Sequence, residues 1–356
     1  MSLSEQIKQN LNQIFCDFKI NAEIESYKIG SRITTYETKL NGTTRINKVI
    51  SLLDDIALRL GKGKINITPP TMGKNTIGIQ VENETIKTVF LNNILNSGQF
   101  NNDSNYKFVL GEDSEGNNII VDVKDLPNLL IAGSTNSGKS VCLNAIITSL
   151  ISNSSPTDLQ MFLIDPKQVE FNIYNELPHL VVPVITDVNK VPKILQCVIR
   201  EMNRRYTWMS NARVRNIDEF NEVQPNKLPK IVIIIDEFAD MMMSNSSRSV
   251  TEDIICRLAQ MGRAAGVYLI IATQRPTVNI ITGKIKANMP SRIAFALTSK
   301  IDSRTILDRN GAETLLGRGD LLFSLAGNEP IRVQGAYIST SQVQNIVEKI
   351  IQKYSN

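Results

Sequence analysis

The hydrophobic positions of the first hundred residues predict a small unit of helices and short strands. Apolar residues recur on a helical period over 3–18 and again over 44–60, which predicts two amphipathic helices. Residues 22–40 alternate in a strand-like way around turn residues at Gly30-Ser31, and short strands are expected at 64–69 and 76–81. We therefore expect a small α+β domain without a catalytic constellation.

A polar stretch rich in Asn, Ser, Asp and Gly follows from Asn92 to Asn118, broken only by Tyr106–Leu110. Such composition is typical of loops and linkers, so we place a domain boundary near residue 100. The prediction is a small domain over 1–100 and a larger domain over 101–356.

The larger domain alternates buried strands with helices. Helices are expected at about 139–151, 190–210 and 250–264, and a last helix follows Thr340. The predicted strands are Leu126–Ala132, Leu159–Ile164, Ile231–Ile235, Val267–Ala272 and Ile293–Leu297. This alternation predicts an α/β fold, a mostly parallel sheet with helices on both faces.

Composition narrows the class of protein. A chain of 356 residues with 42% hydrophobic residues fits a globular protein of two domains. The net charge is only +4, so a nucleic-acid site would have to be a local patch. The single histidine, His179, excludes a multi-histidine metal site. We find no apolar run near the ~20 residues of a membrane-spanning helix, and no secretion signal.

The cysteines indicate the compartment. They are scattered without a C-x-x-C spacing, at Cys16, Cys142, Cys197 and Cys256. We expect reduced thiols in the protein core and a cytoplasmic location.

Residues 133–140 match the phosphate-binding pattern G-x-x-x-x-G-K-[ST]. A predicted strand precedes them and a predicted helix follows, so backbone amides and a helix N-terminus would face one anion. Lys139 would reach the β- and γ-phosphates of ATP, and Ser140 would ligate Mg²⁺. A glycine-rich turn that matches by chance is the alternative. The expected nucleotide-binding residues are Gly133, Ser134, Thr135, Asn136, Ser137, Gly138, Lys139, Ser140 and Val141.

Two acids follow the apolar strand Ile231–Ile235. At the carboxyl end of a sheet strand, Asp236 would support the Mg²⁺ shell through water, and Glu237 would orient or deprotonate the attacking water. The alternative is an acidic strand end that caps the next helix. Together with the phosphate loop, the pair predicts hydrolysis as well as binding.

Polar residues also end the neighbouring strands. Asp165-Pro-Lys167 places a carboxylate and a lysine at the same sheet edge, where an ion pair and a functional role are equally good interpretations. Gln274 is well placed to sense the γ-phosphate or to position water, although it could be an ordinary polar strand end.

Phosphoryl transfer requires positive charge on the γ-phosphate, which a neighbouring subunit often supplies as an arginine. Arg263 follows the helix after the acidic pair and is the first candidate, with Arg292 and Arg304 as rivals. Each could instead be a surface arginine.

Basic residues are concentrated late in the chain, at Arg275, Lys284, Lys286, Arg292, Lys300 and Arg304. Several lie in an expected loop, 276–290, and an expected turn, 300–304. Lysine and arginine on loops can bind a phosphate backbone, although solvated loop charges are common. Because no aromatic residue interleaves with them, double-stranded DNA fits better than single strands.

These residues resemble the FtsK/SpoIIIE family of DNA translocases. The matching segments are collinear over nearly all of 120–340, and residues 20–95 resemble that family's small α domain. The segments include Gly133–Ser140, Ile164–Lys167, Glu201–Tyr206, Val232–Met243, Arg263–Gly266, Ala272–Pro276, Ile280–Gly283 and Ser299–Asp308.

The resemblance implies a RecA-like P-loop NTPase domain in a homo-hexameric ring that moves duplex DNA through its centre. It implies that Arg263 acts in trans on the neighbour's nucleotide. It also implies that Arg275 and Lys286 lie on one pore loop, and Lys300 and Arg304 on the other. The implied cofactors are ATP and Mg²⁺, and the partners are DNA and a loading partner that the sequence does not identify.

Two positions depart from the family pattern. Asn136 stands where the family has glycine, and we expect the loop to persist because asparagine tolerates positive φ. Tyr268 replaces a histidine and receives no interpretation. The chain could be a free translocase of a mobile element or a motor excised from a longer protein.

The predicted function is ATP-driven translocation of double-stranded DNA. A conjugation coupling protein, or a secretion motor of the same superfamily, is one alternative. A nucleotide-gated DNA clamp that rarely hydrolyses ATP is another.

Overall fold

A computed structural model describes residues 2–68, 75–100, 104–126, 128–243 and 248–354. Residues 69 and 127, inside two predicted strands, and residues 101–103, beside the predicted domain boundary, lie outside this description. The chain divides into two compact units. The first comprises 1–89 with the hairpin turn 112–118, and the second comprises 90–111 and 119–356.

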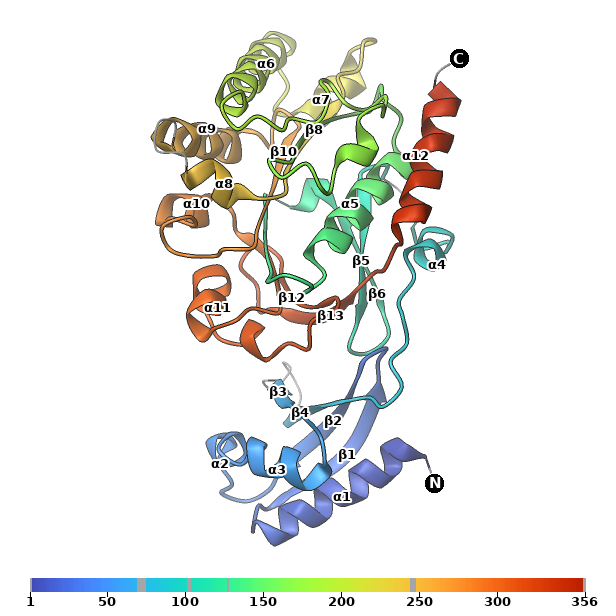
Figure 1. The fold of residues 1–356 in the computed structure, drawn as a ribbon, viewed down its shortest axis with the longest axis vertical. Coiled ribbons are helices and arrows are strands. Elements are labelled where there is room, and N and C mark those ends of the chain that lie inside the picture. The colour runs from blue at the N-terminus through green and yellow to red at the C-terminus, as the bar shows by residue number, and fades with distance from the viewer. Residues whose placement is uncertain (1, 69–74, 101–103, 127, 244–247, 355–356) are drawn as a thin grey trace. The chain divides into compact units, whose positions relative to one another are not determined.

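The first unit is an antiparallel sheet of order β1-β2-β4-β3 that packs against helices (Figure 1). Its apolar core joins the helices to the sheet through buried side chains such as Leu11, Phe15, Tyr36 and Ile79. The predicted helix over 44–60 is two helices, because the backbone leaves the helix at Ser51-Leu52. The elements are α1 (Leu3–Asp17), β1 (Ala22–Ile29), β2 (Ile33–Leu40), α2 (Ile46–Ile50), α3 (Leu53–Leu60), β3 (Ile65–Thr68) and β4 (Thr76–Glu82).

The second unit is built on a nine-stranded sheet of order β6-β5-β13-β12-β11-β7-β10-β9-β8. The five strands from β11 to β8 are parallel to one another, whereas β12 is antiparallel to both of its neighbours, β11 and β13. The strands are β5 (Lys107–Asp113), β6 (Asn118–Asp122), β7 (Leu129–Ala132), β8 (Leu159–Ile164), β9 (Lys230–Ile235), β10 (Val267–Thr273), β11 (Ser291–Phe295), β12 (Asp320–Ser324) and β13 (Ile331–Gly335).

Helices cover both faces of this sheet (Figure 1). On one face, α6, α8, α9, α10 and α11 share an apolar core with alternate residues of β9, Ile231, Ile233 and Ile235. On the other face α5 and α12 pack side by side. The helices are α4 (Leu91–Leu95), α5 (Lys139–Asn153), α6 (Val191–Ala212), α7 (Ile217–Val223), α8 (Phe238–Met243), α9 (Arg248–Met261), α10 (Gly283–Asn288), α11 (Lys300–Leu307) and α12 (Thr340–Tyr354); short 3₁₀ turns are η1 (Val123–Asp125), η2 (Asn172–Tyr174) and η3 (Ala312–Thr314).

The structure corrects three local predictions in this unit. Of the strand expected over 126–132, the described residues show β7 (Leu129–Ala132), and a 3₁₀ turn at Val123–Asp125 comes before it. The strand expected over 293–297 begins and ends two residues earlier, as β11. The turn expected at 300–304 is the first part of α11, which begins at Ser299 where the side chain accepts a hydrogen bond from the Asp302 amide.

The cysteines are only partly where we expected them. Cys142 and Cys256 are buried, but Cys16 and Cys197 are exposed on helices, so the prediction of four core thiols is wrong for two of them. Burial raises the pKa of the Cys142 thiol to about 12.

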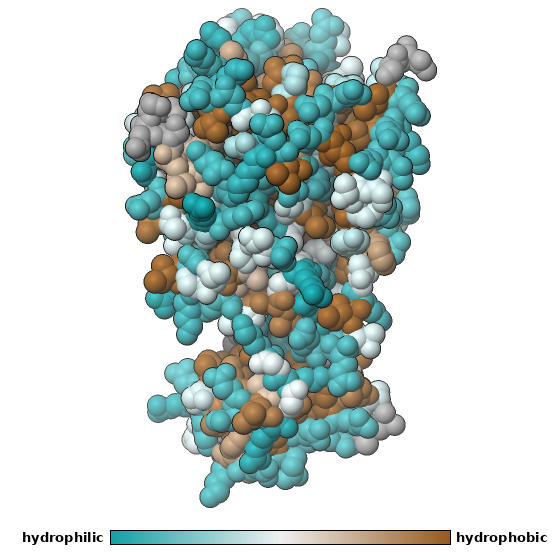
Figure 2. All heavy atoms as spheres, in the orientation of Figure 1, coloured by the Kyte–Doolittle hydropathy of each residue, from teal (hydrophilic) through white to brown (hydrophobic). Residues whose placement is uncertain are grey.

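The surface drawn in Figure 2 intersperses hydrophobic residues with hydrophilic ones on both units. Single exposed apolar side chains of this kind are normal for a folded protein. Within the described ranges, no helix is long and apolar enough to cross a membrane.

Candidate functional site

The predicted phosphate loop connects the central strand β7 to the first turn of α5. Asn136 lies in the left-handed region at φ 61°, and Gly138 has φ 112° just before the helix. A Cβ atom on Gly133 would lie 2.4 Å from Ser137 Oγ, and one on Gly138 would lie 2.7 Å from the Gly319 amide nitrogen. The loop therefore needs both glycines, and asparagine adopts the strained position as expected.

The loop presents polar groups that suit an anion. Lys139, Ser140 and Val141 form the first turn of α5, so their amides have no partner inside the helix. The Ser137 hydroxyl is buried, and the described part of the chain offers it no hydrogen-bond partner. Backbone donors at a helix N-terminus and an orphaned hydroxyl fit the phosphates of a nucleotide.

Lys139 and Asp236 form a buried ion pair. The Lys139 ammonium lies 2.5 Å from Asp236 Oδ1 and 2.8 Å from the Asp236 carbonyl oxygen. Both side chains are 2% exposed. The loop after β7 and the end of β9 therefore meet across β10, as the prediction of one composite site requires.

Glu237 is held by several side-chain and backbone contacts at the same ends of the strands. Its Oε1 accepts hydrogen bonds from Thr273 Oγ1 at 2.7 Å and from the amides of Gln274 and Ala239 at 3.2 and 3.3 Å. Its Oε2 lies 3.2 Å from the Lys167 ammonium. These contacts join the ends of β8, β9 and β10 at one buried carboxylate that is 1% exposed.

Asp165 and Lys167 have separate roles in this geometry. The buried Asp165 carboxylate accepts hydrogen bonds from the amides of Glu170 and Phe171 at 2.9 and 3.0 Å, which fixes the loop after β8. That loop carries Lys167, whose side chain is 40% exposed, onto Glu237. The sequence left open whether Lys167 pairs or acts, and the structure shows the ion pair.

The residues for a magnesium ion also lie at this edge. Ser140 is in the first turn of α5, and Asp236 is tied to the preceding residue, Lys139. A hydroxyl and a carboxylate are oxygen ligands of the kind that Mg²⁺ takes together with water and substrate phosphates. No group of three or more His, Cys, Asp or Glu that could hold a metal occurs among the described residues.

Gln274 and Thr273 end β10, between the phosphate loop and the acidic pair. The Gln274 amide donates to Glu237, and its half-buried side chain lies at the same edge. Sequence reasoning missed Thr273, whose buried hydroxyl holds Glu237. Its position as the last residue of an apolar strand was the available signal.

Arg263 does not join this site within one chain. It lies exposed in the turn before β10, whereas the phosphate loop follows β7. Strands β7 and β10 are parallel, so Arg263 before the start of β10 and the phosphate loop after the end of β7 lie at opposite ends of the strands. The seven residues of β10 span roughly 20 Å. The turn is fixed by Arg205, which donates to the Ala265 carbonyl at 2.9 Å.

Three of the four predicted DNA contacts are exposed near the carboxyl ends of strands. Arg275 follows β10 beside Gln274, with one contact to Met243 Sδ at 3.7 Å. Lys300 and Arg304 are exposed on α11, which follows β11. Their charges are available to solvent on a rigid helix.

Lys286 lies on α10 and is engaged by Asp308. The carboxylate of Asp308 pairs with Lys286 at 2.5 Å and also with Arg292. Burial raises the pKa of Asp308, but hydrogen bonds from the two cations outweigh burial and hold the pKa below its usual value. Arg292 also donates to the Ile306 carbonyl, so it links β11 to α11.

His179 is packed in the interior. Its Nε2 lies 3.0 Å from the Ser154 carbonyl oxygen at the end of α5, and its ring meets Tyr354 edge to face. Burial lowers the pKa of His179.

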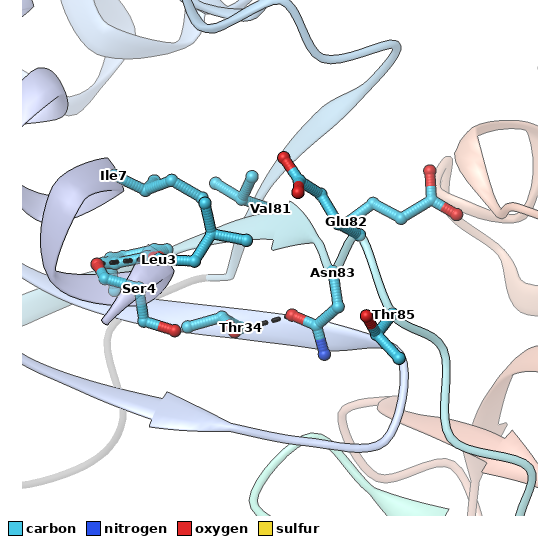
Figure 3. Close-up of a pocket in the computed structure, with 10 residues that line it drawn as sticks. Leu3, Ser4, Ile7, Thr34, Val81, Glu82, Asn83 and Thr85 are labelled. Carbon is cyan, nitrogen blue, oxygen red and sulfur yellow. Dashed lines mark hydrogen bonds between the residues drawn. The ribbon is translucent and has the colours of Figure 1, made fainter. Parts of the chain in front are cut away.

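A cavity of about 140 Å³ in the first unit lies between α1, β2 and β4 (Figure 3). Thr34 Oγ1 donates to Asn83 Oδ1 at 2.6 Å, and the Tyr36 hydroxyl donates to the Ser4 carbonyl. Burial raises the pKa of Tyr36 to about 12, so this hydroxyl stays neutral. The polar groups are satisfied locally, and the chemistry of the phosphate loop has no counterpart in this lining.

Comparison with known proteins identifies the same family that these motifs indicate. The profile of the FtsK/SpoIIIE family matches residues 90–278, and that of the FtsK alpha domain matches residues 2–83. DNA translocase FtsK of Clostridium acetobutylicum is 46% identical over 354 residues, which are 98% of this chain and 46% of that protein. DNA translocase SpoIIIE of Bacillus subtilis is 45% identical over 96% of this chain and 45% of its own length. The chain thus spans about half the length of these relatives.

A solved structure shares the fold over the whole chain. The pCW3 conjugation coupling protein TcpA, in its monomer form with ATPγS, covers 98% of this chain and 99% of its own at a TM-score of 0.68 and 24% identity. The cytoplasmic domain of the type VII secretion ATPase EccC of Thermomonospora curvata covers 74% of this chain at a TM-score of 0.64 and 21% identity. These likenesses confirm the predicted P-loop NTPase fold with a mostly parallel sheet.

Proposed function

The chain belongs to the FtsK/SpoIIIE family, and on that premise we propose that it is an ATP-hydrolysing motor that translocates double-stranded DNA. Its relatives carry the name DNA translocase. The observation that carries the hydrolytic part is the buried Glu237 carboxylate beside the phosphate loop, held by contacts from three strand ends.

Each residue at the sheet edge has a role in this proposal. The loop Gly133–Val141 binds the phosphates, and Lys139 moves from Asp236 to the β- and γ-phosphates when ATP binds. Ser140 and Asp236 would hold Mg²⁺, which would supply positive charge to the phosphates. Glu237 orients and deprotonates the attacking water, and Gln274 reports the γ-phosphate to Arg275 next to it.

Six copies of the chain form a ring in this proposal, with Arg263 of one subunit completing the nucleotide site of the next. The position of Arg263 at the far edge of its own sheet supports action in trans. Exposed Arg275, Lys300 and Arg304, together with Lys286, contact the DNA backbone without reading sequence. Each role is a proposal that substitution can test.

The test compares the wild type with Glu237→Gln. We expect the variant to bind ATP with unchanged affinity and to lose DNA-stimulated hydrolysis by at least a hundredfold, the range typical of a general base. Unchanged turnover would remove Glu237 from the mechanism.

Displacement of a third strand from a duplex then separates motor from clamp. A translocase displaces the third strand with ATP and fails with a non-hydrolysable analogue, whereas a clamp gives the same result with both. A motor for protein cargo would show no stimulation of its ATPase by duplex DNA.

A further inference from the structure

The loop Gly317-Arg318-Gly319 has three successive residues in the left-handed region, with φ values of 72°, 49° and 95°. Glycine adopts this region freely, but a residue with a Cβ is disfavoured there by roughly 1–2 kcal/mol. A glycine at position 318 would relieve that strain. Strained backbone residues cluster at ligand sites, so an arginine in this conformation indicates that its side chain binds a ligand.

This loop contacts the phosphate loop directly. The Gly319 amide donates a 2.8 Å hydrogen bond to the Ser137 carbonyl oxygen. A Cβ atom on Gly138 would lie 2.7 and 2.8 Å from the nitrogen and Cα of Gly319, so the two backbones are in van der Waals contact. The exposed Arg318 side chain therefore begins one residue away from the loop that binds phosphate.

Buried polar contacts fix the loop from behind. Asp320 accepts two hydrogen bonds from Arg332, at 2.9 and 2.6 Å, and both residues are buried. Gln334 Nε2 donates to the Arg318 carbonyl at 3.0 Å, and the Gly335 amide donates to the Gly319 carbonyl at 2.7 Å. The backbone of Arg318 is thus held in place, which reduces the entropy lost when its side chain binds a ligand.

The strand order indicates which part of a nucleotide Arg318 would meet. Asp236 and Glu237 lie beyond β10 on one side of β7, and that side must receive the γ-phosphate, because hydrolysis occurs there. The Gly317–Gly319 loop lies on the other side of β7, at the start of β12 beyond β11. A nucleotide with its γ-phosphate at Glu237 extends its nucleoside end toward β11 and β12.

We propose that Arg318 binds the nucleoside monophosphate half of the nucleotide, through the α-phosphate and the face of the base. The inference rests on the proposed nucleotide site at Gly133–Val141. A guanidinium suits both contacts, because it donates charge-assisted hydrogen bonds to phosphate oxygens and stacks on aromatic rings.

The test measures affinities for ADP, ATP and inorganic pyrophosphate by displacement of a fluorescent ADP analogue. Arg318→Ala is expected to weaken ADP and ATP alike by about tenfold or more, the effect of one charge-assisted hydrogen bond, and to leave pyrophosphate, which has no nucleoside monophosphate half, unchanged. Arg318→Gly should give the same loss while its midpoint of thermal unfolding stays at or above that of Arg318→Ala, because glycine accepts the backbone conformation. A purely structural role predicts instead that Arg318→Gly binds ADP like the wild type, and that result overturns the proposal.

Two further variants complete the experiment. Arg309→Ala removes another exposed arginine, paired with Glu329 at the surface, and should bind all three ligands like the wild type. Equal weakening of pyrophosphate in Arg318→Ala would place the contact at the β- and γ-phosphates and overturn the assignment. Lys139→Ala should lose affinity for all three, and if it does not, the proposed nucleotide site itself is wrong.

Discussion

At the scale of single residues, the position of Glu237 depends on neighbours that are distant in sequence. Thr273 and the Gln274 amide hold one side of the carboxylate, and Lys167 holds the other. A carboxylate fixed in this way is preorganised for a water molecule, which is how a general base acquires its rate advantage. Lys167 is therefore a positioning residue for Glu237.

Lys167→Ala should lower ATP turnover at saturating ATP by about tenfold, part of the contribution of a general base, because Glu237 loses one of its contacts. Nucleotide affinity should stay unchanged, and Lys167→Arg should recover part of the rate. Lys190→Ala is the matched control, since Lys190 pairs with Asp187 at the surface. Steady-state hydrolysis assays check this, and a wild-type rate in Lys167→Ala would refute the positioning role.

The phosphate loop could be predicted from the sequence, but the contacts of Glu237 could not. Successive backbone amides of one turn bind one anion, so the residues of the phosphate loop are consecutive in the sequence. The motif can therefore be recognised from the sequence alone. Thr273 and Lys167 reach Glu237 only because the strand order places β8 and β10 on either side of β9. Spacing along the chain does not give that order.

At the scale of elements, Asp308 joins two helices that carry predicted DNA contacts. It ends α11 at φ 60°, and it pairs with Lys286 of α10 and with Arg292 at the start of β11. The Lys286 charge is thereby partly neutralised where the proposal needs it for DNA.

Asp308→Asn should strengthen binding to duplex DNA several-fold at low salt and steepen the logarithmic salt dependence by about one unit, because one more lysine becomes available to phosphates. Asparagine keeps the left-handed backbone, so the helix end should persist. Fluorescence anisotropy of a labelled duplex over a salt series checks this. Asp302→Asn removes the same charge from the same helix without releasing Lys286, so equal effects of both variants would argue against the role of Lys286.

His179 links the end of α5 to α12. Its titration makes the stability of the second unit depend on pH. Its pKa is lowered in the folded state because of burial, so the unfolded chain binds the proton first as pH falls below about 6.5. This contribution to stability is fully present above that pH and is lost below it.

His179→Gln should therefore reduce the difference between the urea midpoints at pH 7.5 and pH 5.5. The comparison within each protein cancels the loss of packing, and the acidic residues common to both contribute equally. An unchanged pH difference would mean that His179 titrates alike in the folded and unfolded states.

The elements that the sequence patterns missed lack a long apolar run or were not recognised by their capping residue. Ile231–Ile235 was predicted because a strand covered on both faces is continuously apolar. The antiparallel strands β12 and β13 are five residues each, and both contain polar residues that are satisfied by pairing across the ladder, such as Asp320 with Arg332. The start of α11 does carry a readable signal, Ser299 three residues before Asp302.

At the scale of the whole molecule, the residues that we propose for catalysis lie at two different ends of the parallel strands within one chain. The phosphate loop and Glu237 lie at the carboxyl edge of the parallel strands, and Arg263 lies at the amino edge. A head-to-tail interface between copies would bring these two ends together, and repetition of such an interface gives a ring when the rotation between copies closes. The proposed role of Arg263 therefore requires contact between copies of the chain, as in the proposed ring.

This geometry predicts that two inactive variants restore activity when they are mixed. Arg263→Ala keeps its phosphate loop, and Lys139→Ala keeps its arginine, so an interface between the two contains one complete site. In a randomly mixed ring, roughly a quarter of the sites would be complete, since each needs a particular variant on either side. DNA-stimulated hydrolysis of an equimolar mixture, refolded or co-expressed so that subunits exchange, measures the recovery. If no mixing ratio gives more activity than either variant alone, while gel filtration shows mixed assemblies, then Arg263 does not act on a neighbour's nucleotide.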